Sequence, residues 1–370
     1  MVERFSSLAD AAAWFQAWFA EAALPLWADV GVDGAHGLFQ EGLDVDGRPV
    51  AGPRRARAQA RQVFVFATAA SSGYGERWLP TAREGYGRFV QHYRRPDGLF
   101  LRLAGPDGTP LETDADIYDQ AFAMLAVAAL HTADPAGGFA AEADRTLAAL
   151  QARRAPAGGF QESPPHPFQA NCHMHLFECA LAWEEVGGGP EWTGLADEIA
   201  GMALARFIDA DTGALREFFD PQWRAITGEA GLVEPGHQFE WAWLLERWGR
   251  ARQEPAALAA ARRLYANGLK GVDAERQVAV NALWDDFSVR DADARLWPQT
   301  EHLKAALVLG SEAEALRAAR GLAQYLETPA RGAWRDKLRA DGSFVDEPAP
   351  ATSFYHLAVA ILELRAHTAG

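Results

Sequence analysis

The amino-acid sequence predicts an all-α protein whose helices form an (α/α)6 barrel, a closed double ring of six helix pairs with short β-hairpin-like loops. Two observations predict this fold class. A glycine-containing motif recurs about every 60 residues, and the segments between its copies show helical apolar spacing. Because the repeat runs along the whole chain, we expect a single catalytic domain over residues 1–370.

The repeated motif is a glycine followed two residues later by an aromatic or apolar residue. A period of this length is too long for the common solenoid repeats and fits two helices plus a short extended turn. An open helical solenoid is the alternative, but its repeats are usually shorter. The copies begin at Gly37, Gly98, Gly158, Gly213 and Gly332, and Gly271 stands where the missing copy is expected.

Alanine and leucine dominate the predicted helices, and proline and glycine cluster between them. Strand-like alternation is confined to brief pieces beside the glycines. The predicted helices cover residues 8–22, 58–71, 77–93, 116–131, 138–152, 171–186, 193–209, 237–250, 254–267, 298–309, 312–326 and 353–366. These segments make the six pairs of the predicted ring.

The chain is acidic, which excludes several classes of partner. Lys and Arg total 35 against 50 Asp and Glu, a net charge of −15 that argues against nucleic acid or an anionic membrane. No apolar run approaches membrane-spanning length, and the N-terminus lacks the pattern of a secretory signal. Cys172 and Cys179 are too few for a disulfide framework. We therefore expect a soluble cytoplasmic protein, a monomer or a homodimer.

Residues 234–248, EPGHQFEWAWLLERW, place a histidine at the start of a predicted helix with three tryptophans. His237, Glu240 and Trp241 are spaced so that they share one helical face, which suggests a small polar ligand. The helix dipole disfavours the imidazolium form at an N-terminus, so we expect a neutral His237 that can act as a general base. A histidine that only caps the helix is the alternative.

A second polar group lies in residues 169–182, QANCHMHLFECALA. Asn171, His175 and Glu178 share one helical face, and these polar neighbours favour a ligand-binding His175 over a buried structural one. A metal site made by His173 and His175 is the alternative, but residues two apart share a side only on a strand. The apolar residues that follow indicate a helix, so we expect no metal.

The segment of residues 295–307, RLWPQTEHLKAAL, contributes two candidate contacts. Trp297 precedes a proline, which is a poor place in a helix interior but a good one for lining the mouth of a site. Gln299 could contact a ligand. His302 and Lys304 are expected to face solvent.

Two further polar residues stand within apolar helices. His356 interrupts the apolar pattern of residues 351–364, which is costly unless the imidazole is paired or functional. Arg61 precedes a strongly apolar run, so its charge must meet a carboxylate or a ligand oxygen. The neighbouring Arg54, Arg55 and Arg57 are expected to be surface charge.

Other enzyme classes leave weaker signals. The chain contains no glycine-rich nucleotide-binding fingerprint and no GxxxxGK[ST] motif. Glycosidases also use helical barrels and need two carboxylates at the scissile bond. Glu240 and Asp119 could form such a pair, although the unusual residues of this chain are histidines.

Six segments, taken together and in order, resemble the N-acylglucosamine 2-epimerase superfamily. It includes mannose isomerases, sulfoquinovose isomerase, cellobiose 2-epimerases and N-acetylglucosamine 2-epimerase. The resemblance spans nearly the whole chain, and the family fold is an (α/α)6 barrel. The segments are QARQVFVFA, YDQAFAMLA, NCHMHLFECALA, EPGHQFEWAWLL, RLWPQTEHLKAA and SFYHLAVAILEL.

The resemblance implies roles for individual residues. His237 and His356 would be the two acid–base histidines, and Arg61 would hold sugar oxygens and support the negative charge of the intermediate. Trp297 would form a wall of the pocket, while binding of the open-chain sugar would fall to Tyr118, Asn171, His175 and Glu240. One departure is Phe354, where cellobiose epimerases carry a tryptophan; the missing stacking plate favours a monosaccharide over a disaccharide.

The implied chemistry is proton abstraction from the carbon next to a carbonyl group. It gives a cis-enediol(ate), whose oxygens need cationic and hydrogen-bonding support. Proton return to C1 makes a ketose, and return to the opposite face of C2 makes the epimer. We expect an isomerase of D-mannose and D-fructose that needs no cofactor, with a small-molecule sugar as its partner. A 2-epimerase of mannose, glucose or N-acetylglucosamine is the alternative, and an inverting glycosidase is a more distant one.

Overall fold

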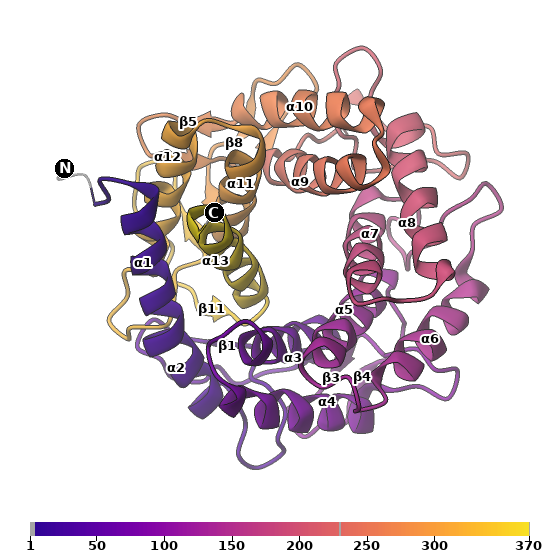
Figure 1. Ribbon diagram of the computed structural model, residues 1–370, viewed down its shortest axis with the longest axis vertical. Helices are drawn as coiled ribbons and strands as arrows, with labels where there is room; N and C mark the ends of the chain where they lie inside the picture. The colour runs from indigo at the N-terminus through magenta and orange to yellow at the C-terminus, as the bar shows by residue number, and fades with distance from the viewer. Residues whose placement is uncertain (1–3, 229–230, 370) are drawn as a thin grey trace.

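The computed structural model describes residues 4–228 and 231–369 of the chain. It confirms the predicted (α/α)6 barrel: an inner ring of helices lies within an outer ring (Figure 1). Each inner helix contacts the next one along the chain, and the last contacts the first, which closes the ring. The inner helices are α3 (Ala56–Ser71), α5 (Ile117–Ala133), α7 (Ala170–Glu185), α9 (Pro235–Arg252), α11 (Leu296–Leu309) and α13 (Ser353–Ala369).

The outer ring covers the inner one, and its first helix packs against its last. Helix α1 contacts both α12 and α13, so the two ends of the chain meet in the ring. A π-helical turn at Phe19–Ala23 joins α1 to α2. The outer helices are α1 (Leu8–Trp18), α2 (Leu24–Asp29), α4 (Leu79–Tyr93), α6 (Phe139–Leu150), α8 (Pro190–Met202), α10 (Pro255–Leu269) and α12 (Glu312–Ala323).

Inner and outer helices differ in burial. The outer helices bury one face, as an amphipathic helix on the surface of a protein does. The inner helices are buried on nearly all sides, because the outer ring and both neighbours cover them. The expectation that His302 and Lys304 face solvent is therefore wrong, since these α11 side chains are 1% and 0% exposed. No helix among the described residues is both long and apolar enough to cross a membrane.

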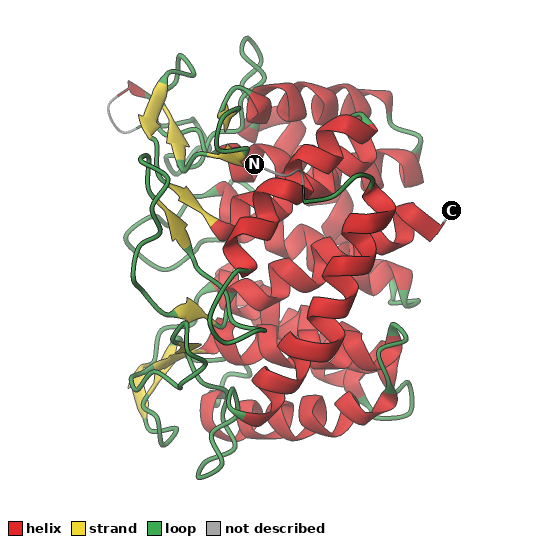
Figure 2. Ribbon diagram, turned by 90° about the vertical axis from the view of Figure 1, so that its left-hand side faces the viewer, coloured by secondary structure: helices red, strands yellow, loops and turns green. Residues whose placement is uncertain are grey.

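Short antiparallel strands gather at one end of the barrel, beside the starts of the inner helices (Figure 2). They pair as β1–β11, β2–β3–β4, β5–β6, β7–β8 and β9–β10. The strands are β1 (Gly42–Leu43), β2 (Arg54–Arg55), β3 (Leu103–Ala104), β4 (Pro110–Glu112), β5 (Val272–Asp273), β6 (Val278–Ala279), β7 (Ala282–Leu283), β8 (Val289–Asp291), β9 (Ala294–Arg295), β10 (Lys337–Leu338) and β11 (Ala349–Pro350).

The repeated glycine motif forms the turn that joins an outer helix to the next inner one. Gly37 has a φ of 70°, which favours glycine. Two residues after this glycine, the backbone of the turn is hydrogen-bonded to a glutamine of the inner helix. The Phe39 N–H donates to Gln59 Oε1 at 2.8 Å, and Gln59 Nε2 donates to the Phe39 carbonyl at 2.8 Å. The same reciprocal pair joins Phe100 to Gln120, Leu215 to Gln238, and Ala279 to Gln299.

Two copies of this turn depart from the sequence expectation. In the copy between α10 and α11, the residue two before Ala279 is Gln277, with a φ of 60°, so Gly271 is not the missing glycine of the repeat. In the third copy a histidine replaces the glutamine: His173 Nε2 accepts the Phe160 N–H at 2.9 Å, and Nδ1 lies 2.9 Å from the Gln169 carbonyl. His173 is thus a structural residue.

Candidate active site

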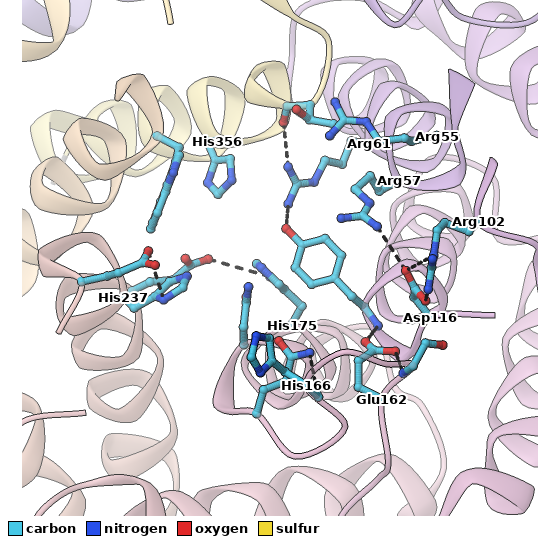
Figure 3. A pocket seen from close by; sticks show the side chains of 18 of the residues that line it. Arg55, Arg57, Arg61, Arg102, Asp116, Glu162, His166, His175, His237 and His356 are labelled. Atoms are coloured by element: carbon cyan, nitrogen blue, oxygen red, sulfur yellow. Dashed lines mark hydrogen bonds and ion pairs between the residues drawn. The ribbon is translucent and has the colours of Figure 1, made fainter. Parts of the chain in front are cut away.

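A cavity of about 580 Å³ opens at the end of the barrel that carries the strands. Every inner helix contributes side chains from near its start, so residues far apart in the sequence meet there. All the predicted site residues except Gln299 line this cavity: Arg61, Tyr118, Asn171, His175, His237, Glu240, Trp297 and His356. Figure 3 shows the labelled histidines and arginines around it.

Gln299 does not reach the cavity. Its side-chain oxygen accepts the Ala279 N–H at 2.7 Å, and its nitrogen donates to the Ala279 carbonyl at 2.9 Å. It belongs to the set of glutamines that hold the repeated turns. A glutamine at the same place in other repeats, such as Gln59 and Gln120, was the sequence signal for this structural role.

His237 is surrounded by carboxylates. Its Nδ1 lies 2.9 Å from Glu217 Oε2 and 3.5 Å from Glu234 Oε2. Burial alone would lower the pKa of His237, but the charges of Glu217 and Glu234 raise it to about 10. The expectation of a neutral imidazole is therefore wrong, because two nearby carboxylates outweigh the helix dipole. At neutral pH His237 is an imidazolium and can act as an acid.

His356 has the opposite environment. Burial and the positive charges of Arg61 and Lys304 hold the pKa of His356 well below its usual value, so the imidazole is neutral. Its Nδ1 lies 2.9 Å from Glu301 Oε1, which makes Nδ1 the donor and leaves Nε2 as the acceptor. A neutral imidazole with a free acceptor nitrogen is equipped to act as a base.

His175, on α7, also lines the cavity (Figure 3). Its Nδ1 lies 3.4 Å from Glu178 Oε2 and 3.9 Å from Glu240 Oε1. Burial lowers the pKa of His175 to about 4, so this ring is also neutral. It can orient a sugar hydroxyl without carrying charge.

A buried cluster of charged side chains lies beside His175 and His356. Glu178, Glu240 and Glu301 surround Lys304, whose Nζ is 2.6 Å from Glu301 Oε2. Burial opposes the charge of Lys304, but the three glutamates raise its pKa, so it stays an ammonium. Burial and the charge of Glu301 raise the pKa of Glu240 well above its usual value, which makes Glu240 a proton donor.

The same cluster contains the sets of side chains that could hold a metal ion. Donor atoms of His175, Glu178 and Glu240 lie within 4.8 Å of one another, as do those of Glu240, Glu301 and His356. Lys304 already supplies a positive charge to these carboxylates, which is what a cation would do. The alternative considered from sequence, a pair of His173 and His175, is not formed, because His173 holds a turn.

Arg61 is buried, 4% exposed, and lacks a carboxylate partner within ion-pair distance among the described residues. Its terminal nitrogens donate to the Thr352 carbonyl at 3.0 Å and to the Tyr118 hydroxyl at 2.6 Å. Its guanidinium lies 3.9 Å from the Phe122 ring centroid. A cation held in this way next to a cavity can meet a ligand oxygen.

The other arginines near β2 are not free surface charge, contrary to expectation. Arg54 is 4% exposed and pairs with Asp33 at 2.8 Å. Arg57 lines the cavity and lies 2.8 Å from Asp119. Asp119 is itself fully buried and does not line the cavity, so it does not form a glycosidase pair with Glu240 there.

Phe354 lies in the core and not in the cavity. It is fully buried, and its ring lies 5.4 Å from that of Trp334 and 5.7 Å from that of Trp27. The inference that this position lost a stacking plate for a sugar is therefore wrong. Phe354 carries no information on the size of the substrate.

The chain is similar to known sugar isomerases and epimerases. The family model described as N-acylglucosamine 2-epimerase (GlcNAc 2-epimerase) matches residues 37–360. A Rhizobium meliloti (strain 1021) protein named mannose-6-phosphate isomerase is 49% identical over 366 residues, covering 94% of this chain and 95% of that protein. A Thermobifida fusca D-mannose isomerase is 28% identical over 238 residues, 58% of each chain.

Solved structures show the same fold. A cellobiose 2-epimerase from Spirochaeta thermophila DSM 6192 superposes with a TM-score of 0.87 at 22% identity, covering 99% of this chain and 98% of that one. A D-mannose isomerase superposes with a TM-score of 0.86 at 20% identity, covering 96% and 97%. With the family model matching most of its length, the chain belongs to the N-acylglucosamine 2-epimerase family of sugar isomerases and epimerases.

Proposed function

We propose that this protein is an aldose–ketose isomerase that interconverts a mannose-configured hexose and the corresponding ketose through a cis-enediol. The observation that carries the proposal is a pair of histidines in one cavity with different neighbours: His237 lies 2.9 Å from Glu217, and the positive charges of Arg61 and Lys304 act on His356. The family of the chain supports it, and so do the names of two relatives, a mannose-6-phosphate isomerase and a D-mannose isomerase.

In this mechanism the neutral His356 removes the C2 proton of the open-chain aldose through Nε2. The bond electrons form the C1–C2 double bond while the carbonyl oxygen O1 takes a proton from the His237 imidazolium. His237, now neutral, then takes the proton of the O2 hydroxyl as the C2 carbonyl forms, and His356 delivers its proton to C1, which leaves the ketose. One base serving both carbons gives isomerisation, whereas epimerisation needs delivery to the opposite face of C2.

Arg61 and Tyr118 support the charge that develops on the sugar oxygens. Arg61 brings to the cavity a cation that has no carboxylate partner in the described part of the chain, and its bond to the Tyr118 hydroxyl holds both groups in place. Positioned donors of this kind stabilise an enediolate more than the starting sugar. We infer that these groups and Lys304 provide the positive charge of the site, so that the reaction needs no metal.

The two relatives differ in whether the named sugar carries a phosphate. Both D-mannose and D-mannose 6-phosphate are therefore candidates for the mannose-configured substrate. A 2-epimerase remains the second candidate function, because both histidines line the cavity and could face opposite sides of a sugar.

The test is incubation of the pure protein in deuterated water with each sugar, with the products followed by NMR. Fructose or its phosphate, with deuterium at C1, is the expected result. Glucose or its phosphate without ketose would make the protein an epimerase. If neither sugar gives ketose or takes up deuterium, the proposal is wrong.

A further inference from the structure

The cavity has a second chemical feature, a wall of arginines. Arg55, Arg57 and Arg102 line the cavity on the side of Arg61, away from His237 (Figure 3). They come from β2, the start of α3 and the loop before β3, so the fold brings them together. We define these three residues as the arginine wall.

We propose that the arginine wall is a phosphate-binding subsite, which holds a phosphate monoester on the end of the sugar far from C1 and C2. The inference rests on the proposed function and names its substrate class: a hexose phosphate in preference to the free hexose. Planar guanidinium groups bind phosphate through two parallel N–H bonds, and they are the side chains most suited to it.

The wall is held in place by carboxylates behind it. Asp116 accepts from Arg102 Nε at 2.8 Å and from Arg102 Nη2 at 2.6 Å, and it also lies 3.3 Å from Arg57 Nη2. Asp119 lies 2.8 Å from Arg57 Nε. Glu41 binds Arg55 through Nε and Nη2. The guanidinium groups are thus oriented before a ligand arrives, which reduces the entropy lost on binding.

Donors remain for a ligand after these contacts. Among the described residues, Arg57 and Arg55 make their ion pairs through Nε and Nη2, which leaves Nη1 of each. The side chain of Arg57 is 24% exposed and that of Arg102 is 25% exposed, so both are partly desolvated and still reachable. A neutral hydroxyl would make little use of two such cations.

Each arginine of the wall has a carboxylate partner, so the positive charge that an anion meets on this side depends on Arg61 and on how well solvent screens those carboxylates. Asp116 divides its charge between Arg57 and Arg102, and the other two carboxylates near Arg102, those of Glu112 and Asp114, are 48% and 72% exposed, where solvent screens them. The carboxylate of Glu162 also borders the cavity, but it accepts the backbone N–H groups at the start of α5. Arg61 lies nearby and has no carboxylate partner within residues 4–228 and 231–369, so an anion gains from entering this side.

The experiment measures binding without turnover. D-mannitol and D-mannitol 1-phosphate are open-chain hexitols that lack a carbonyl group, so neither can react. Calorimetry with the full protein is expected to show the phosphate ester binding roughly 10- to 100-fold more tightly than mannitol, as one or two charge-assisted hydrogen bonds provide. Arg57→Met is expected to remove most of this preference, and Arg57→Lys part of it.

The control is Arg83→Met, which removes an outer arginine, 49% exposed, that pairs with Asp134 away from the cavity. It should keep the full preference for the phosphate ester. Equal binding of the two hexitols by the wild-type protein, or an unchanged preference in folded Arg57→Met, overturns the subsite. If the proposed function fails instead, no ketose forms from mannose or from mannose 6-phosphate, whatever the hexitols show.

Discussion

The regions around His237 and His356 form two sides of one cavity, and they treat the same type of side chain in opposite ways. On the α9 side, Glu217 and Glu234 lie within 3.5 Å of His237 and raise its pKa to about 10. On the α13 side, burial with Arg61 and Lys304 keeps the pKa of His356 well below its usual value. In the proposed mechanism the neighbours, and not the residue type, decide which histidine is the acid and which is the base.

The difference in pKa between the two histidines also depends on whether a lysine is paired with the carboxylate beside each one. Glu301 bonds to His356 but shares its charge with Lys304, so it orients the ring without making it an imidazolium. Glu217 lies 2.9 Å from His237, and no lysine is paired with it among the described residues. The buried lysine is therefore part of what separates the two histidines.

The largest effects are expected from removing the histidines themselves. His237→Asn and His356→Asn should each reduce turnover about 10²–10⁴-fold, the usual cost of losing a positioned acid or base. His356→Asn should also abolish deuterium exchange at C2 of the aldose, whereas His237→Asn should keep slow exchange with little ketose. NMR in deuterated water measures both. His36→Asn, at an exposed site, is the control. Wild-type turnover in either folded variant would remove that histidine from the proposed mechanism.

Arg61→Ala tests the cation on the His356 side. Removing a donor to the developing oxyanion should lower turnover by on the order of 10²–10³, far beyond any effect of the lost stability. Steady-state kinetics and thermal unfolding separate the two effects. Arg83→Ala should be nearly silent, because Arg83 pairs with Asp134 outside the cavity. Similar kinetics for the two variants would show that Arg61 has no role in the reaction.

Lys304→Met tests the buried cluster. The variant leaves Glu178, Glu240 and Glu301 without their cation, and breaking a buried ion pair costs about 3–5 kcal/mol of unfolding free energy. Urea denaturation measures the loss. Lys337→Met is the matched control: its partner Glu347 is 3.8 Å away at a half-buried site, and a change within about 0.5 kcal/mol is expected. A loss as small as that of the control would remove Lys304 from the cluster.

Glu217→Gln should shift the pH dependence of the reaction. The folded-state pKa of His237, about 10, lies above its ordinary value of 6.5. The ion pair therefore stabilises the fold fully below 6.5, and this contribution is lost as the pH rises through about 10. In the wild type, kcat/KM should fall on the alkaline side near the same pH. In Glu217→Gln the alkaline fall of kcat/KM should move to lower pH. If it does not move, the fall reports the titration of a group other than His237.

The smallest effect is expected from removing metal ions. Lys304 and Arg61 supply positive charge on the His356 side, so exhaustive chelation should leave turnover unchanged. Activity before and after chelation, with and without added divalent ions, measures this. Activity lost on chelation and restored by one ion would place a metal among Glu178, Glu240, Glu301 and the histidines.

Patterns within single segments were enough to predict the fold and the composition of the cavity. Helical spacing and the recurring turn predicted the double ring, and the resemblance of six segments led to His237, His356 and Arg61. The wrong expectations concerned contacts between elements that are far apart in the sequence. Gln299 looked like a ligand contact because the bonds from its side chain to Ala279 cross between two elements.

Local patterns in the sequence show which residues share a helical face, where the turns fall and which polar side chains lie near the starts of inner helices. The protonation and burial of these side chains depend on contacts between elements that are far apart in the sequence. His237 meets Glu217 across 20 positions and His356 meets Glu301 across 55, while Lys304 is buried because other helices cover α11. A pKa depends on desolvation and on charges a few ångströms away in space, and neither is encoded in the spacing of residues along one helix.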